Sequence, residues 1–323
     1  MLTAFAALLV GFIVLVWSAD KFVYGASATA SSFNISPLVV GVVIVGLGTS
    51  APEMVVSAIA SLSGNSELSV GNALGSNITN VGLILGLTAL LIPLHVKSRI
   101  VKKELPLMFG VLLFGAALLY DRHLSLLDGC LLFGGFIALI LWSLYAATTN
   151  PDDALSEEFS QELANAPSRS KAIFWLVFGM LVLVASSRLL VWGAVNIATA
   201  LGISDLIIGL TIVAIGTSLP ELAASIAAAR KQEFDIAIGN VVGSNMFNLL
   251  GVMALPAIIA PGAVSNEAFI RDVPVMLGLA LLLWLFSSNF TLRNNGTISR
   301  VNGAVLIAVY VAYIAYLVAV NIA

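Results

Sequence analysis

The sequence consists largely of apolar runs of about twenty residues, and these runs restrict the folds that the chain can adopt. A helix that crosses about 30 Å of hydrocarbon needs about 20 consecutive apolar residues. Cutting the chain where charged and turn residues cluster leaves ten segments, at approximately 2–24, 36–62, 67–92, 104–120, 126–148, 171–200, 204–229, 235–260, 272–288 and 300–321. The sequence therefore predicts an all-α polytopic membrane protein with ten transmembrane helices.

The composition supports this class and excludes others. Hydrophobic residues make up 60% and charged residues 10% of the chain, whereas charged residues form about a quarter of a soluble globular chain. The net charge of −3 offers no basic surface for a nucleic acid. One cysteine, Cys130, and two histidines, His95 and His123, make neither a disulfide framework nor a zinc cage. We therefore expect no nucleic-acid partner and no resident cofactor.

A hydrophilic stretch at 149–170 separates two halves, 1–148 and 171–323. We interpret it as a solvated acidic linker that carries Asp152, Asp153, Glu157, Glu158 and Glu162. When the 14 Lys and Arg residues are sorted over alternate loops, eleven fall on one side. This bias predicts a multi-pass protein of the plasma (inner) membrane, with a cytoplasmic linker and both termini outside. The first segment lacks a preceding cationic stretch and a cleavage site, so we expect a span rather than a removed signal peptide.

The two halves are repeats of each other, aligned without a gap at a constant offset of 168 residues. The stretch from Gly48 to Glu53, G-T-S-A-P-E, recurs as G-T-S-L-P-E, and G-N-A-L-G-S-N at 71–77 recurs as G-N-V-V-G-S-N at 239–245. Each half contains five predicted spans, an odd number, so the two copies enter the membrane from opposite sides. Inverted repeats of this kind are typical of secondary transporters.

Two carboxylates stand out because they lie near the middle of predicted spans. Of the 17 acidic residues, Glu53 and Glu221 alone have this position, and they match at the repeat offset. Placing a carboxylate at that depth costs a free energy of about several kcal/mol unless it is paired, protonated or hydrated. Polar residues accompany them at helical spacing: Thr49, Ser57, Asn72, Ser76 and Asn80 in one half, and Thr217, Ser225, Asn240, Ser244 and Asn248 in the other. Oxygen ligands of this kind suit hard cations such as Ca²⁺ and Na⁺.

Proline and glycine add two expectations about these helices. Pro52 and Pro220 have no N–H, so we expect the carbonyl groups of Gly48 and Gly216 to be free to bind a cation, in helices broken near the motif. The small-residue pairs Gly71/Gly75 and Gly239/Gly243 predict close backbone contact that brings the asparagine and serine stripes near the glutamates.

The doubled motif, G-T-S-x-P-E followed by G-N-x-x-G-S-N in inverted halves, resembles the alpha repeats of the cation/calcium antiporter superfamily. The sodium/calcium exchangers belong to that superfamily, and the compact chain is similar to its prokaryotic members along essentially its whole length. The resemblance implies ten transmembrane helices with broken helices at the centre. It also implies transport rather than enzymatic activity, with Ca²⁺ exchanged against Na⁺, or in some branches against protons or together with K⁺.

The resemblance also implies a set of ligands. Glu53 and Glu221, with the carbonyl groups of Thr49 and Thr217, would surround Ca²⁺. Overlapping Na⁺ sites would use Ser50 and Ser76 on one flank, Ser218 and Ser244 on the other, and backbone carbonyls near Gly46 and Ala214. Asn80 and Asn248 would line the centre. Some relatives carry Asp at one of the last two positions. Because this chain has Asn at both, its predicted site holds two carboxylates rather than three.

The predicted function is antiport in which two carboxylates bind either one Ca²⁺ or several Na⁺. Competition for the same oxygens would couple the two fluxes. A proton-coupled calcium antiporter and a passive cation channel stay open as alternatives. An intramembrane enzyme is disfavoured, because His95, His123, Cys130, Asp121 and Asp128 lie near loops or helix ends without a matched partner. The expected partners are inorganic cations and the lipid bilayer; the sequence predicts no particular protein partner.

Overall fold

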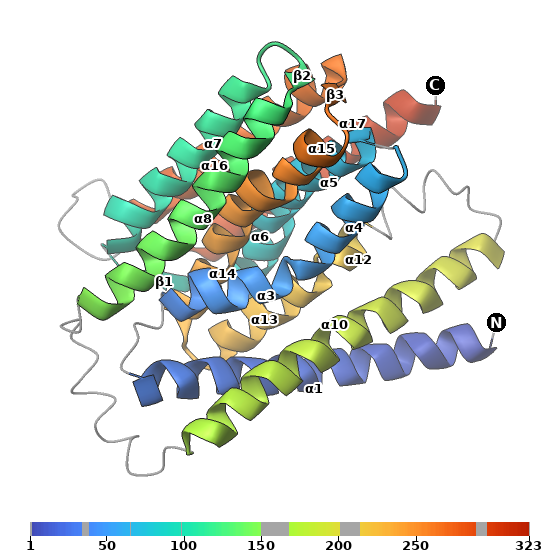
Figure 1. Cartoon of the computed structure of the whole chain (residues 1–323). Coiled ribbons are helices and arrows are strands. Elements are labelled where there is room, and N and C mark those ends of the chain that lie inside the picture. The colour runs from blue at the N-terminus through green and yellow to red at the C-terminus, as the bar shows by residue number, and fades with distance from the viewer. Residues whose placement is uncertain are drawn as a thin grey trace. The chain divides into compact units, whose positions relative to one another are not determined.

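The computed structural model describes residues 2–33, 39–64, 66–97, 99–149, 168–200, 214–288 and 296–322. These residues are almost entirely helical (Figure 1), with several π-helical turns, labelled η, and two short β-ribbons. The elements of the first half are α1 (Leu2–Phe33), η1 (Val40–Val45), α3 (Gly46–Thr49), α4 (Ala51–Leu62), α5 (Ser66–Thr79), η2 (Asn80–Leu85), α6 (Gly86–Leu91), β1 (Leu94–Val96), η3 (Ile100–Glu104), α7 (Leu105–Leu118), β2 (His123–Leu124) and α8 (Leu126–Thr149). Those of the second half are α10 (Arg169–Ala200), α12 (Ala214–Thr217), α13 (Leu219–Arg230), α14 (Phe234–Phe247), η6 (Asn248–Val252), α15 (Ala254–Ile259), β3 (Gly262–Ala263), η7 (Ala268–Asp272), α16 (Val273–Ser287), β4 (Gly296–Ile298) and α17 (Arg300–Ile322).

The helices confirm the predicted class, an all-helical membrane protein. Each of the ten predicted segments contains helix in its described part. Among the described residues, seven helices are long and apolar enough to span a membrane, or eight if Gly41–Thr49 and Ala51–Leu62 form one bent span. The predicted spans at 104–120 and 204–229 are not among them: α7 has 14 residues, and residues 204–213 lie outside the described part. The topology of ten inverted spans stays a prediction.

The first helix is longer than predicted. We expected a span at 2–24 with charges at its end, but α1 continues to Phe33, so Asp20 lies inside the helix. Ala26 and Ala30 of this extension are buried in the apolar cluster that α1 forms with α10. The charge of Asp20 is partnered, because Lys231 Nζ lies 2.9 Å from its carboxylate and donates to its backbone carbonyl at 2.8 Å. The predicted acidic linker at 149–170 falls largely outside the described residues, which omit 150–167.

Contacts divide the chain into two compact units, each described here by itself. Unit 1 comprises Met1–Thr49 and Ala138–Asn240, and unit 2 comprises Ser50–Ile137 and Val241–Ala323. Each unit contains segments from both halves of the sequence. The compact units therefore do not coincide with the predicted repeats at 1–148 and 171–323.

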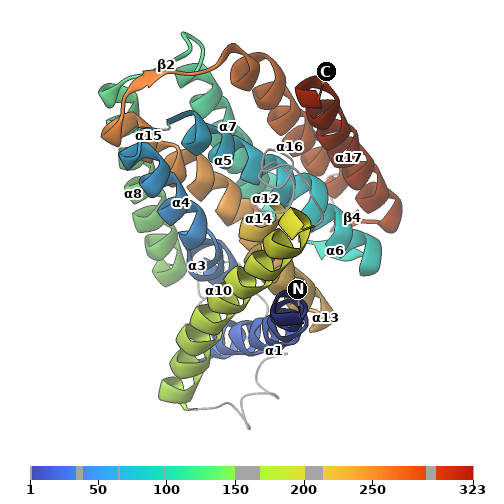
Figure 2. The same ribbon diagram turned by 90° about the vertical axis from the view of Figure 1, so that its right-hand side faces the viewer.

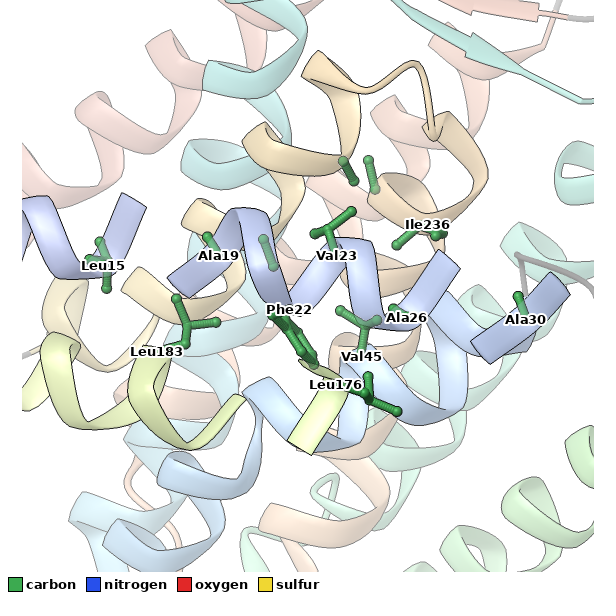
Figure 3. Close-up of a cluster of buried hydrophobic side chains, with 13 residues drawn as sticks. Leu15, Ala19, Phe22, Val23, Ala26, Ala30, Val45, Leu176, Leu183 and Ile236 are labelled. Atoms are coloured by element: carbon green, nitrogen blue, oxygen red, sulfur yellow. The ribbon is translucent and has the colours of Figure 1, made fainter. Parts of the chain in front are cut away.

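Unit 1 is organised around α1 and α10, which run side by side in opposite directions (Figure 1). Its apolar core forms where α1 meets α10, η1, α13 and α14 (Figure 3). Phe22 and Val23 of α1 are fully buried there, together with Leu183 of α10 and Ile236 of α14. Burying a side chain of this size contributes about 1.5–3 kcal/mol.

Glycines at matched positions allow the backbones of α1 and α10 to touch. A Cβ at Gly25 would overlap the backbone nitrogen of Leu176, and one at Gly179 would lie 2.7 Å from the backbone nitrogen of Phe22. Gly11 and Gly193 match Gly179 and Gly25 at the repeat offset. A Cβ added at Gly11 or Gly193 would lie 3.0 or 2.8 Å, respectively, from a backbone atom of the opposite helix. Small residues commonly permit this approach between membrane helices.

Unit 2 is tied together by pairs of segments that are distant in the sequence. Strand β1 pairs antiparallel with β4, with Leu94 opposite Ile298, and β2 pairs with β3. Helix α17 packs along α6 and η2 (Figure 2). At one such contact the buried carboxylate of Asp272, in η7, accepts hydrogen bonds from Arg271 Nε at 2.7 Å and Tyr313 Oη at 2.9 Å. The strand pairs and the contact of α17 with α6 and η2 each join a first-half segment to a second-half one, whereas the Tyr313–Asp272 bond joins α17 to η7 within the second half.

The Gly25→Ala variant is expected to melt at a lower temperature than the wild type in detergent. Overpacking against a backbone costs about 1–3 kcal/mol, more than the roughly 1 kcal/mol of helix propensity that alanine adds. The matched control is Gly134→Ala in α8, where an added Cβ meets no atom within 4 Å; its melting temperature should be unchanged or higher. Equal melting of both variants would show that the α1–α10 contact does not require Gly25.

Candidate cation site

The helix that carries Glu53 is broken one turn before this residue, at Ser50. Helix α3 ends at Thr49, α4 begins at Ala51, and the segments on either side are bent by 45°. Pro52 lies in the first turn of α4, where its missing N–H leaves no helical bond unmade. The helical ladder resumes with the bond from Met54 N to Ser50 O at 3.1 Å. The predicted break is confirmed here.

The same break recurs in the second half. Helix α12 ends at Thr217 and α13 begins at Leu219 with Pro220 in its first turn. The bond from Leu222 N to Ser218 O, at 3.1 Å, matches the one in the first half. The side chains of Glu53 and Glu221 are each 1% exposed. Both carboxylates are therefore buried in the first turn after a proline break.

One predicted carbonyl ligand is already in use. We expected Pro220 to leave the carbonyl group of Gly216 free for a cation, but Ser187 Oγ of α10 donates a hydrogen bond to it at 2.9 Å. Contrary to our expectation, the Gly216 carbonyl group is therefore not unpartnered, because a side chain from a distant helix uses one of the two lone pairs of its oxygen. The first half has Ala19 where the second has Ser187. The two breaks therefore differ, and sequence analysis missed Ser187 because nothing local links it to the motif.

The asparagines of the G-N-x-x-G-S-N motifs contact the glutamate helices. Asn72 Nδ2 donates to the backbone carbonyl of Glu53 at 3.1 Å and to Ser57 Oγ at 2.9 Å. In the second half Asn240 Nδ2 donates to the corresponding atoms of Glu221 and Ser225, also at 3.1 and 2.9 Å. These contacts bring the polar stripe of the third and eighth predicted segments against the glutamate helices.

Asn80 and Asn248 are buried, and their side chains have no hydrogen-bond partner among the described residues. They begin the π-helical turns η2 and η6, and their side chains are 1% and 0% exposed. Neither amide atom of either residue, nor Ser218 Oγ, has a hydrogen-bond partner in the described part of the chain. A buried polar group without a partner costs about 1–3 kcal/mol, and π-helical turns are frequent at functional sites. Their oxygens are available as ligands for a hard cation.

The predicted ligands divide between the two units. Unit 1 contains Gly46, Thr49, Ala214, Thr217, Ser218 and Glu221, and unit 2 contains Ser50, Glu53, Ser76, Asn80, Ser244 and Asn248. Within unit 1, α3 lies against α13; within unit 2, η6 contacts both α4 and α5. All eight predicted side-chain ligands are buried; of the two threonines predicted to bind through their carbonyl groups, Thr49 is buried and Thr217 is partly exposed.

The expected role of two glycines is not observed. A Cβ added at Gly71 or Gly75 would meet no atom within 4 Å, so these residues do not mediate close backbone contact. Hydrogen bonds from the Asn72 side chain, rather than glycine contacts, connect α5 to α4. A small-xxx-small spacing permits close approach, but the packing decides whether a neighbouring helix uses it.

Comparison with known proteins relates the whole chain to one family. The family model described as sodium/calcium exchanger protein matches residues 3–145 and 171–319. The chain is 48% identical to a putative antiporter, CaxA, of Alkalimonas amylolytica, over 97% of this chain and 98% of the relative. It is 44% identical to the inner membrane protein YrbG of Escherichia coli, over 88% of this chain and 90% of the relative.

The fold also matches a solved structure. The sodium-calcium exchanger NCX_Mj, in a crystal soaked with Na⁺ and Sr²⁺, superposes with a TM-score of 0.84 at 33% sequence identity. The match covers 97% of this chain and 98% of that one. Sequence and fold therefore agree over nearly the full length.

Replacing Asn248 with leucine should separate stability from cation binding. A leucine removes two unpartnered polar atoms from a buried position, so we expect the ion-free protein to melt at a higher temperature. The rise in melting temperature on adding Ca²⁺ should shrink, because an oxygen ligand is lost.

The control for Asn248→Leu is Ser287→Ala. It too removes a buried polar group, here a hydroxyl, that has no partner among the described residues. Ser287 ends α16, away from both motifs, so its variant should keep the full Ca²⁺-induced rise. A full rise in Asn248→Leu as well would exclude Asn248 from Ca²⁺ binding.

Proposed function

The chain belongs to the sodium/calcium exchanger protein family, and we propose that it exchanges Ca²⁺ for Na⁺ through Glu53 and Glu221. The family consists of transporters rather than enzymes, and this chain is a multi-pass membrane protein that transports inorganic cations. The finer proposal concerns the coupling ion and the residues that bind it.

The observation that carries the proposal is the burial of the two glutamates at matched helix breaks. Each glutamate is 1% exposed, directly follows a proline and lies in the first turn of the helix that restarts after the break. Buried carboxylates require compensation. Bound cations supply it, and the neighbouring groups are hydroxyl, amide and carbonyl oxygens, which Ca²⁺ and Na⁺ prefer.

The proposed ligand set follows the repeat. Ca²⁺ binds the two carboxylates and the carbonyl oxygens of Thr49 and Thr217. Na⁺ ions use overlapping sites with Ser50 and Ser76 on one side and Ser218 and Ser244 on the other, together with backbone carbonyls near Gly46 and Ala214. Asn80 and Asn248 line the centre. Either one Ca²⁺ or several Na⁺ neutralise the two negative charges, so the ions exclude one another.

Charge neutralisation also explains why such a site exchanges ions rather than leaking them. Two carboxylates in a low dielectric are costly unless a cation is bound, so the loaded states change access more readily than the empty one. Ten spans in two inverted five-helix repeats, 1–148 and 171–323, would present the same site alternately to each side. By the positive-inside rule both termini lie outside and the linker at 149–170 lies inside.

Reconstituted vesicles test this function directly. With an imposed Na⁺ gradient, wild-type protein should accumulate radioactive Ca²⁺ against its concentration gradient. Glu53→Gln and Glu221→Gln should each abolish this uptake, because one negative charge cannot balance Ca²⁺. The control Glu67→Gln changes an exposed acid in the first turn of α5 and should transport normally.

Two other outcomes identify the alternative functions. Uptake that ignores Na⁺ and follows an imposed pH gradient would replace Na⁺ coupling with proton coupling. Flux that follows only the Ca²⁺ gradient and the voltage would indicate a passive channel. Uptake that survives both glutamate substitutions would exclude these residues as the cation ligands.

A further inference from the structure

Asn72 and Asn240 occupy matched positions and make matched contacts. In both halves the side-chain nitrogen lies 3.1 Å from the backbone carbonyl oxygen of the glutamate and 2.9 Å from the hydroxyl of the serine four residues later. A carbonyl oxygen only accepts hydrogen bonds, so the atom that faces it must be the amide nitrogen. Both hydrogens of that nitrogen are used, one for each acceptor.

This orientation changes the role expected for these side chains. In the sequence they belong to stripes of oxygen-bearing residues, which suggests cation ligands. An amide nitrogen with two hydrogens carries no lone pair for a cation. The nitrogens of Asn72 and Asn240 therefore bind the protein itself. Each donates to a backbone carbonyl at one end of a helical turn and to a serine hydroxyl at the other end.

That turn is the one that carries the carboxylate. Glu53 and Ser57 are separated by one turn of α4, as are Glu221 and Ser225 in α13, and both turns directly follow a break. A helix that has just restarted after a break lacks the preceding turn that normally restrains it. The serines are fully buried and Asn240 is 0% exposed, so water does not compete for the bonds of Asn240, whereas Asn72 is partly exposed.

Asn240 has an additional contact that reaches the other repeat motif. Its Oδ1 lies 3.1 Å from Thr49 Oγ1, at the end of α3, and all three residues Thr49, Asn240 and Glu221 belong to unit 1. The Thr49 hydroxyl has one hydrogen and three acceptors in reach: Val45 O at 3.0 Å, Gly46 O at 3.3 Å and Asn240 Oδ1. A single amide thus connects the first-half break to the second-half glutamate.

We propose that Asn72 and Asn240 are positioning residues, which clamp the glutamate turns through their amide nitrogens and so set cation affinity without ligating the ion through those atoms. The inference rests on the proposed function, since it assigns the glutamates as cation ligands. Groups that orient metal ligands typically change metal affinity by about 10–100-fold when they are removed. The clamp is expected to act at the lower end of this range in each half.

An alanine and an aspartate at each position distinguish positioning from ligation. Asn→Ala removes the donor, and Asn→Asp keeps the shape but places an acceptor against the glutamate carbonyl. A positioning residue loses affinity in both variants, whereas a ligand that binds through oxygen retains or gains affinity as aspartate. The variants are Asn72→Ala, Asn72→Asp, Asn240→Ala and Asn240→Asp.

The readout is Ca²⁺ binding to purified protein by calorimetry, together with the half-saturation and maximal rate of exchange in vesicles. We expect the dissociation constant to rise about tenfold or more in all four variants, with the half-saturation concentration rising in parallel and the maximal rate changing less. Aspartate variants that bind Ca²⁺ as tightly as the wild type, or more tightly, would overturn the proposal.

Two sets of variants guard against a trivial loss of folding. Asn77→Ala truncates the same residue type on the same helix, where Asn77 Nδ2 contacts Met276 Sδ at 3.5 Å rather than a glutamate helix, and should leave Ca²⁺ affinity unchanged. Ser57→Ala and Ser225→Ala remove one acceptor of the clamp and keep the carbonyl bond, so a smaller loss of affinity is expected. Unchanged affinity in both serine variants would also count against the clamp.

Glu53→Gln, measured in the same titration, separates this proposal from the proposed function. If Glu53→Gln loses Ca²⁺ binding while the asparagine variants keep it, the clamp is wrong and the function stands. If Glu53→Gln binds Ca²⁺ normally, the glutamate site itself is wrong.

Discussion

The burial of two carboxylates is the constraint on which the rest of the site depends. Glu53 and Glu221 are 1% exposed inside a chain that is 60% hydrophobic. A charge in such surroundings requires a compensating charge or a dense set of dipoles. The proline breaks lie at the start of the glutamate helices, Asn72 and Asn240 contact these helices, and η6, which begins at Asn248, contacts α4. These features are coherent with a site that binds cations through oxygen ligands.

Two devices position the glutamates, and they act at different ranges. Proline acts locally: it ends the hydrogen-bond ladder and lets a new helix start within two residues of the carboxylate. The asparagine clamp acts across helices, because Asn72 and Asn240 reach the backbone of the glutamate turn from the neighbouring helix. Their distances agree in the two halves. The repeat therefore preserves not only residue types but the contacts that these residues make.

The halves are not equivalent throughout. Ser187 donates to the Gly216 carbonyl group, but the residue that matches Ser187 in the first half is Ala19. Lys231 pairs with Asp20, but Ser63 matches Lys231 and Arg188 matches Asp20. Neither interaction can form in its matched version: alanine has no hydroxyl, and serine does not carry the charge that an ion pair with arginine needs. In the proposed exchanger, such differences would give the two access states unequal energies.

The sequence alone determined the class, the repeat and the breaks, because each depends on local chemistry: apolar runs long enough for a bilayer, a doubled motif, and a residue without an N–H. It also singled out Glu53 and Glu221, since a charge within an apolar run is visible without coordinates. It could not reveal that Ser187 occupies the Gly216 carbonyl, that α1 extends to Phe33 along α10, or that Asn72 and Asn240 point nitrogen rather than oxygen at the glutamate helices. Those facts depend on which surfaces meet across tens of residues of chain. Only tertiary packing decides them, because a hydrogen bond requires its two atoms within about 3 Å and the sequence specifies no such distance.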